Sequence, residues 1–168
     1  MADKKIKLIT QTAIFCALAC VLAFVENMLL PPLPMGVKLG ISNLLVLLAL
    51  ELTGVKSAFF IVLSKSAFVF LTRGVTAFLM SASGGIVSFI IAVILIRKTK
   101  RSCVLISSLC GIFHNLGQLS MASILTASAY SLWYFPVLCV CGCVSGVFVG
   151  ILFYVICKRL CDMKFFEF

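Results

Sequence analysis

The stretch "ENMLLPPLPMGVKLGISN", Glu26 to Asn43, breaks an otherwise apolar sequence with three prolines, two glycines and a lysine. Pro31, Pro32 and Pro34 have no amide donor, and each disfavours a helix at the residue before it. Residues 30–37 are therefore predicted to be extended or turned. Long apolar runs flank the stretch on both sides, so one helix is expected to end before it and another to begin after it.

The composition of the chain is that of a helical membrane protein. Of its 168 residues, 63% are hydrophobic and 11% are charged, with a mean hydropathy of +1.26. A soluble domain carries about a quarter charged residues, so burying this much apolar surface requires lipid. An open sheet leaves backbone groups unpaired in hydrocarbon, and the alternating pattern of a membrane barrel is absent. The sequence predicts an all-α, polytopic membrane protein.

Six transmembrane helices are predicted. Each needs roughly 20 mostly apolar residues, and the expected boundaries are 7–25, 39–52, 57–72, 78–96, 103–125 and 134–157. Little sequence is left for a soluble part, so residues 1–168 are expected to form a single integral membrane domain. Non-helical backbone cannot face lipid, so the proline-containing segment must lie at an interface or line a cavity. A short span beside such a segment is typical of transporter sites.

The basic residues predict the orientation of the chain. With the amino terminus inside, six crossings return the carboxy terminus to the same side, and most of the 14 lysines and arginines fall on cytoplasmic segments. This distribution follows the positive-inside rule. We therefore expect a multi-pass protein of the cell membrane with both termini cytoplasmic. Basic residues at helix ends explain the net charge of +9 without a nucleic-acid partner.

Polar residues from five predicted spans fall at similar depth, in the half that this orientation places outside. Hydrocarbon penalises such residues, which marks them as functional candidates. The predicted substrate-binding residues are Glu26, Asn27, Lys38, Asn43, Lys65, Arg73, Ser83, Gly84, His114, Asn115 and Gln118. Three cations against one carboxylate favour an anionic ligand, such as a carboxylate or phosphate compound.

Each of these residues also has a structural interpretation. Lys65, in mid-span, could pair with a backbone carbonyl, and Arg73 could be an interfacial anchor. Glu26 could form an ion pair with Lys38 or Arg73. Ser83 and Gly84 could serve helix packing. His114 could be a packing residue, although it shares a broad helix face with Asn115 and Gln118.

The sequence offers little for catalysis or metal binding. Asp3 and Asp162 are the only aspartates, so an aspartate-rich pair for Mg²⁺-diphosphate chemistry is missing, as are a Walker lysine loop and a nucleophile elbow. His114 has no second histidine or carboxylate at a ligand spacing. We expect a protein that is not an enzyme and carries neither a metal ion nor a cofactor.

Two stripes of small residues indicate close helix contacts. Gly142, Gly146 and Gly150 are spaced by four in the last span, and Ala13 and Ala17 form a smaller version in the first. Either stripe could contact the same chain or another subunit.

The order of these motifs resembles a known family. An acid, "PPLP", "GVKLG" with Asn43, then "SGG" and "HNLGQL" are similar to the heptaprenyl diphosphate synthase component I family, also called Gx transporter proteins. The resemblance covers nearly the whole chain. Family members tend to have Gly-Leu-Ala-Asn where this chain has Gly40-Ile41-Ser42-Asn43, a mild departure in the wall of the expected site.

The resemblance implies the fold and role of a substrate-binding S component of an energy-coupling-factor (ECF) importer. Such a subunit holds a vitamin- or cofactor-like ligand near the outer face, and residues 28–37 would close over it. Ala13 and Ala17 match the motif that docks on a membrane scaffold subunit, and two cytoplasmic ATPases would complete the complex. The synthase name implies an alternative, a non-catalytic membrane subunit that assists a separate polyprenyl diphosphate synthase. A component of a flavin or quinone redox assembly is a further alternative.

Overall fold

The computed structural model describes residues 2–29, 40–98, 102–128 and 133–162. Within these ranges the chain forms helices and no strand, which confirms the all-helical prediction. The proline-containing segment 30–37 and Lys38 lie outside the described residues. The helices are α1 (Ala2–Leu29), α2 (Ile41–Leu52), α3 (Val55–Lys98), α4 (Cys103–Leu125) and α5 (Phe135–Asp162).

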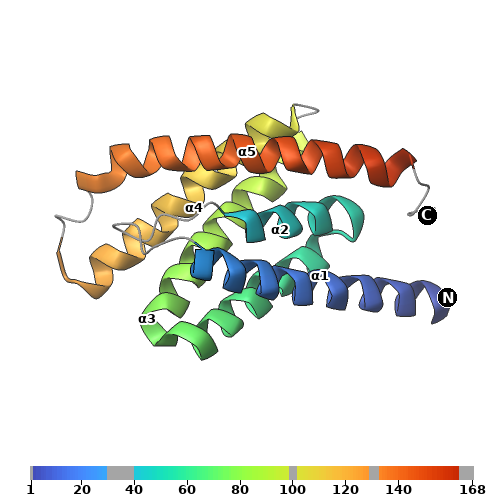
Figure 1. Ribbon diagram of the computed structural model, residues 1–168, viewed down its shortest axis with the longest axis horizontal. Coiled ribbons are helices and arrows are strands. Elements are labelled where there is room, and N and C mark those ends of the chain that lie inside the picture. The colour runs from blue at the N-terminus through green and yellow to red at the C-terminus, as the bar shows by residue number, and fades with distance from the viewer. Residues whose placement is uncertain (1, 30–39, 99–101, 129–132, 163–168) are drawn as a thin grey trace.

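The longest helix, α3, folds back on itself at Gly74. Gly74 has φ 84° and ψ −175°, a backbone conformation that is essentially restricted to glycine. Three contacts join residues that lie at nearly equal distances along the sequence before and after Gly74. The rings of Phe59 and Phe89 lie 5.6 Å apart, those of Phe70 and Phe78 lie 5.9 Å apart, and Gly85 packs against Val62. Residues 55–73 and 75–98 therefore form two antiparallel limbs, as Figure 1 shows.

The two limbs of this hairpin correspond to two helices that the sequence predicts, and they differ from the prediction in how they are joined. The sequence predicts spans at 57–72 and 78–96 with a connection between them, whereas residues 73–77 are part of the helical element. A single glycine with positive φ reverses the chain, so no connecting loop is needed. We call residues 55–73 the first limb of α3 and residues 75–98 the second limb.

Four of the helices, α1, α3, α4 and α5, are long and apolar enough to cross a membrane. The 44 residues of α3 are about twice what one crossing needs. The protein is thus a multi-pass membrane protein. The remaining helix, α2, has 12 residues, and its central part from Leu44 to Leu50 is entirely apolar. Every residue from Leu44 to Leu50 is buried, because α1, α3 and α5 pack around this helix.

Two helix pairings position the polar residues. The first limb of α3 runs beside α1 in the same direction, with Thr12 hydrogen-bonded to Ser57 at 3.0 Å near the start and Arg73 hydrogen-bonded to Asn27 at 2.7 Å near the end. The second limb packs on α4, where the Ser83 hydroxyl donates to the Gly117 carbonyl at 3.0 Å.

The glycine stripe of the last helix packs within the chain. Gly142, Gly146 and Gly150 face α4 so closely that a Cβ at Gly146 would lie 2.5 Å from Ser108 Cα, and one at Gly150 would lie 2.6 Å from Val104 Cα. Small residues allow this approach of two helix backbones. The stripe therefore holds α5 against α4.

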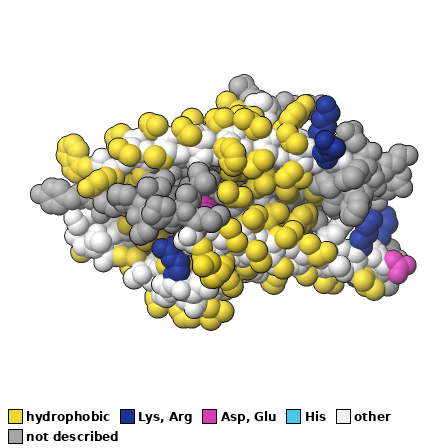
Figure 2. Space-filling view, in the orientation of Figure 1, with side chains coloured by type: hydrophobic (Ala, Val, Ile, Leu, Met, Phe, Trp, Pro, Cys, Tyr) yellow, Lys and Arg dark blue, Asp and Glu magenta, His cyan; other side chains and the backbone are white. Residues whose placement is uncertain are grey.

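The surface fits a membrane environment. Figure 2 shows apolar side chains spread over much of the described part of the visible face, whereas lysine and arginine side chains occur in a few separate places, two of them toward the right of the view. The start of α1 and the end of α5 lie at the same end of the molecule (Figure 1). That end carries the exposed Lys4, Lys5, Lys7, Lys158 and Arg159. The bend at Gly74 lies at the opposite end (Figure 1), which we call the bend end.

Candidate functional site

Polar side chains from four helices line one cavity between the middle of the molecule and the bend end. We call it the charged cavity; it encloses about 330 Å³, its opening included. Its lining residues are Ala23 and Glu26 of α1, Gly40, Ser42 and Asn43 at the start of α2, Lys65, Val69 and Ser81 of α3, and His114 and Gln118 of α4. Five of the predicted substrate-binding residues therefore share one cavity: Glu26, Asn43, Lys65, His114 and Gln118.

Lys65 is held by the start of α2. Its ammonium donates a 2.6 Å hydrogen bond to Asn43 Oδ1 and a weaker one of 3.5 Å to Ser42 Oγ. Only 3% of Lys65 is exposed. A buried lysine is costly unless polar groups compensate its charge. Its position in the cavity wall places a cation where an anionic ligand would need one.

Glu26 caps the amino terminus of α2. Its Oε1 accepts a 2.6 Å hydrogen bond from the Gly40 amide, and the side chain is 5% exposed. Gly40 has φ 70° and ψ 22°, a left-handed conformation that glycine adopts without strain. Because a helix amino terminus carries partial positive charge, it stabilises the carboxylate. Of the two ion-pair partners expected for Glu26, Arg73 is hydrogen-bonded to Asn27 instead, and Lys38 lies outside the described residues.

His114 and Gln118 form a polar pair on the α4 wall. Their Nε2 atoms lie 2.9 Å apart, and both side chains are buried. Gly84 packs against this pair: a Cβ there would lie 2.7 Å from Gln118 Cγ and from the His114 carbonyl oxygen. Ser83 and Gly84 thus bring α3 onto α4, and they lie outside the charged cavity.

Arg73 and Asn27 lie apart from the charged cavity. The Arg73 side chain is exposed, and its guanidinium donates the hydrogen bond to Asn27 Oδ1. Asn27 in turn donates to the Ala23 carbonyl at 2.6 Å. The two residues tie the end of α1 to the first limb of α3 beside its bend. Both were expected in the site, and the geometry gives them a role in joining helices.

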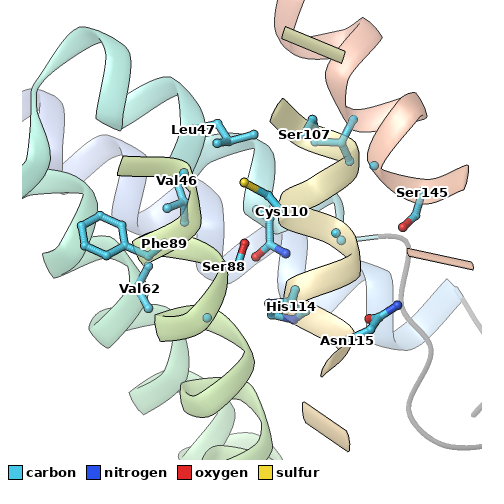
Figure 3. A pocket seen from close by; sticks show the side chains of 17 residues that line it. Val46, Leu47, Val62, Ser88, Phe89, Ser107, Cys110, His114, Asn115 and Ser145 are labelled. Carbon is cyan, nitrogen blue, oxygen red and sulfur yellow. The ribbon is translucent and has the colours of Figure 1, made fainter. Parts of the chain in front are cut away.

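A second cavity adjoins the first and was not predicted. It encloses about 520 Å³, its opening included, and we call it the apolar cavity. Figure 3 shows side chains from α2, α3, α4 and α5 converging on it. Its aliphatic and aromatic lining consists of Val46, Leu47, Val62, Phe89, Ala92 and Val149, and its polar lining includes Ser88, Ser107, Cys110, Asn115 and Ser145. Asn115 is the one predicted site residue found in this cavity alone, and its amide donates to the Leu138 carbonyl at 2.9 Å.

The two cavities meet at three residues. Gly40, Asn43 and His114 line both of them. The side chains of Asn43 and His114 therefore stand between a wall that carries charge and a wall that is mostly apolar. Three mid-helix serines in separate helices, Ser88, Ser107 and Ser145, were the sequence signal that could have revealed the apolar cavity.

The side chains in these cavities can bind polar groups. They offer an ammonium, a carboxylate, amides, an imidazole and hydroxyls, which recognise polar groups by charge and hydrogen bonds. Among the residues that the structure describes, no three histidine, cysteine, aspartate or glutamate side chains are grouped so that they could hold a metal ion.

A family model for heptaprenyl diphosphate synthase component I matches residues 15–156. The chain belongs to this family. The matched residues include the lining of both cavities, the whole of α2, α3 and α4, and parts of α1 and α5, so the candidate site lies within the region shared by the family. The family name describes a component of a synthase and implies a partner component. Comparison with curated proteins and with solved structures gave no match.

Proposed function

We propose that this component I protein is the substrate-binding S component of an ECF-type, ATP-driven importer. Its ligand is a small, anionic, vitamin- or cofactor-like molecule, bound in the charged cavity. The observation that supports this function best is the convergence of Lys65, Asn43 and His114, from three helices, on one cavity. Buried polar groups of this kind destabilise a membrane protein, so they occur chiefly where they bind or transport a ligand or an ion.

The proposal includes a topology. The chain forms a single integral membrane domain over residues 1–168 with both termini cytoplasmic. It crosses the cell membrane six times, through α1, α2, the two limbs of α3, α4 and α5, and the short α2 crosses enclosed by its neighbours instead of facing lipid. The basic residues at the end that holds the termini support this orientation through the positive-inside rule. The bend end and the charged cavity then face outward.

Energy would come from other subunits. The proposed partners are a membrane scaffold subunit and two cytoplasmic ATPases, because this chain has no nucleotide-binding loop of its own. Ala13 and Ala17 are the proposed docking residues. Both are exposed on α1, where small side chains leave room for another helix.

Native mass spectrometry of the protein in lipid nanodiscs tests the binding site. The wild-type protein is expected to carry a small anionic molecule, and Lys65→Met is expected to lose it. Lys56→Met is the matched control, since Lys56 is an exposed lysine in the first turn of the same helix and lies outside both cavities. Equal occupancy in all three proteins would contradict the proposed site.

A second candidate function follows from the family name. The protein would be a non-catalytic membrane subunit of a polyprenyl diphosphate synthase, with the chemistry in a soluble partner. Affinity purification from native membranes separates the two functions. Co-purification of a scaffold with ATPases supports the importer, and co-purification of a prenyltransferase supports the synthase subunit.

A further inference from the structure

We propose that the charged cavity and the apolar cavity form one bipartite binding site for an amphiphilic anion. The ligand would place a carboxylate or phosphate beside Lys65 and an attached, compact hydrocarbon portion in the apolar cavity. This inference rests on the proposed function, because it takes anion binding at Lys65 as its starting point. Beyond that function, it assigns the ligand a hydrocarbon portion and names the residues of the apolar cavity that would bind this portion.

The first step is that the two cavities are neighbours. Gly40, Asn43 and His114 belong to the lining of both, so no further layer of residues separates them. A ligand that passes these residues moves directly from one cavity into the other.

The second step is that side chains form much of this boundary. Asn43 is hydrogen-bonded to Lys65, and His114 is paired with Gln118. An anionic group beside Lys65 would accept the hydrogen bond that Asn43 accepts now, which releases the Asn43 amide to turn. The boundary can therefore open through an exchange of hydrogen bonds, without movement of a helix.

The third step concerns the lining of the apolar cavity. Its hydrocarbon surface comes from Val46, Leu47 and Val62 with Phe89 and Val149, which would remove an apolar group from water. The Ser107 side chain also lines this cavity and is 2% exposed, and its hydroxyl makes no hydrogen bond to the residues that the structure describes. A hydroxyl on a cavity wall can donate a hydrogen bond to a ligand or accept one from it. A polar atom on the inner part of a ligand would be its partner in such a bond.

A series of straight-chain carboxylates tests the proposal on the full-length protein in nanodiscs. Acetate, butanoate and hexanoate are the probes, and hexan-1-ol is the uncharged analogue. Wild-type affinity is expected to rise about fourfold for each methylene that enters the apolar cavity. Hexanoate is expected to bind more tightly than hexan-1-ol, and Lys65→Met is expected to abolish this preference while Lys56→Met keeps it.

A larger side chain at a position that lines the apolar cavity tests whether the hydrocarbon portion of the ligand binds there. Ala92 lines that cavity, is 1% exposed and lies outside the charged cavity. Ala92→Phe is expected to remove the dependence on chain length and to leave the preference for an anion intact. Ala92→Leu is the smaller substitution to use if the phenylalanine variant does not fold.

The possible results separate this inference from the proposed function. If carboxylates bind in a Lys65-dependent manner but chain length has no effect, or if Ala92→Phe and Ala92→Leu leave the chain-length effect unchanged, the bipartite site is wrong and the anion site stands. If no carboxylate binds in a Lys65-dependent manner, the anion site itself is wrong, and the bipartite site falls with it.

Discussion

The ammonium of Lys65 and the side-chain oxygen of Asn43 lie 2.6 Å apart, between the middle of α3 and the first turn of α2. A similar pair joins Arg73 to Asn27 at 2.7 Å, but there the cation is exposed. Two asparagine–cation pairs among the described residues thus differ in burial.

This difference gives a matched stability experiment. Asn43→Leu removes a hydrogen bond from a buried cation and is expected to lower the free energy of unfolding by about 1–3 kcal/mol. Asn27→Leu is expected to lower it by less than about 1 kcal/mol, because water can replace the lost partner of exposed Arg73. Thermal unfolding in nanodiscs measures both. If Asn27→Leu and Asn43→Leu lower the free energy of unfolding equally, burial does not determine how much these hydrogen bonds stabilise the protein.

Glu26→Gln tests the charge balance of the cavity. Glutamine keeps an oxygen that can accept the Gly40 hydrogen bond, but it removes the negative charge from the amino terminus of α2. Stability is expected to fall by about 0.3–1 kcal/mol. Anion binding is expected to tighten about fivefold, which corresponds to roughly 1 kcal/mol of repulsion removed. Titration with hexanoate measures the change. Weaker binding in the variant would mean that the carboxylate itself contacts the ligand.

Gly74→Ala tests the reversal of α3. No atom lies within 4 Å of the position that an added Cβ would occupy, so the cost of the substitution is purely conformational. At φ 84° and ψ −175° this cost is expected to be about 1–3 kcal/mol. Thr72→Ala, at an exposed position two residues earlier, is the control and should change little. Equal melting temperatures of Gly74→Ala and wild type would argue against the glycine-dependent bend.

Two serines that differ in hydrogen bonding provide a test of the apolar cavity in the absence of ligand. The Ser83 hydroxyl donates to the Gly117 carbonyl, so Ser83→Ala is expected to cost about 0.5–1.5 kcal/mol. Ser107→Ala is expected to be neutral or stabilising, because it removes a buried hydroxyl without a bonded partner among the described residues. Melting temperatures compare the two variants. Strong destabilisation by Ser107→Ala would show that this hydroxyl already has a structural role.

The sequence predicted several residues of the charged cavity correctly, but it also placed there residues that lie outside it. Contact with lipid is costly for the polar side chains of Lys65, Asn43 and His114, which belong to apolar helices. A shared cavity that encloses them was therefore the simplest prediction. Arg73 and Asn27 were expected in the same space, but residues near helix ends can reach water without entering a cavity. Their actual pairing depends on how α1 lies beside α3, which periodicity does not determine.

The apolar cavity and the exact form of the reversal in α3 could not be predicted from the sequence, for different physical reasons. Val46, Val62 and Phe89 look the same in a sequence whether they face lipid, a packed core or a cavity. At the bend, the predicted spans 57–72 and 78–96 left room for a loop, and glycine can end a helix in several ways. The antiparallel contacts across Gly74, such as that of Phe70 with Phe78, show that the chain reverses at this one non-helical residue.

The enclosure of α2 has a consequence for biogenesis. Its 12 residues are too few to cross the bilayer as an independent segment, and its neighbours include α5, which follows α2, α3 and α4 in the chain. Its packing therefore cannot be completed until α5 has been synthesised. A nascent chain truncated before residue 135 would lack Ser145, Gly146 and Val149 from the cavity wall and would leave α2 without one of its covering helices. Completion of the site therefore has to wait until α5 has emerged.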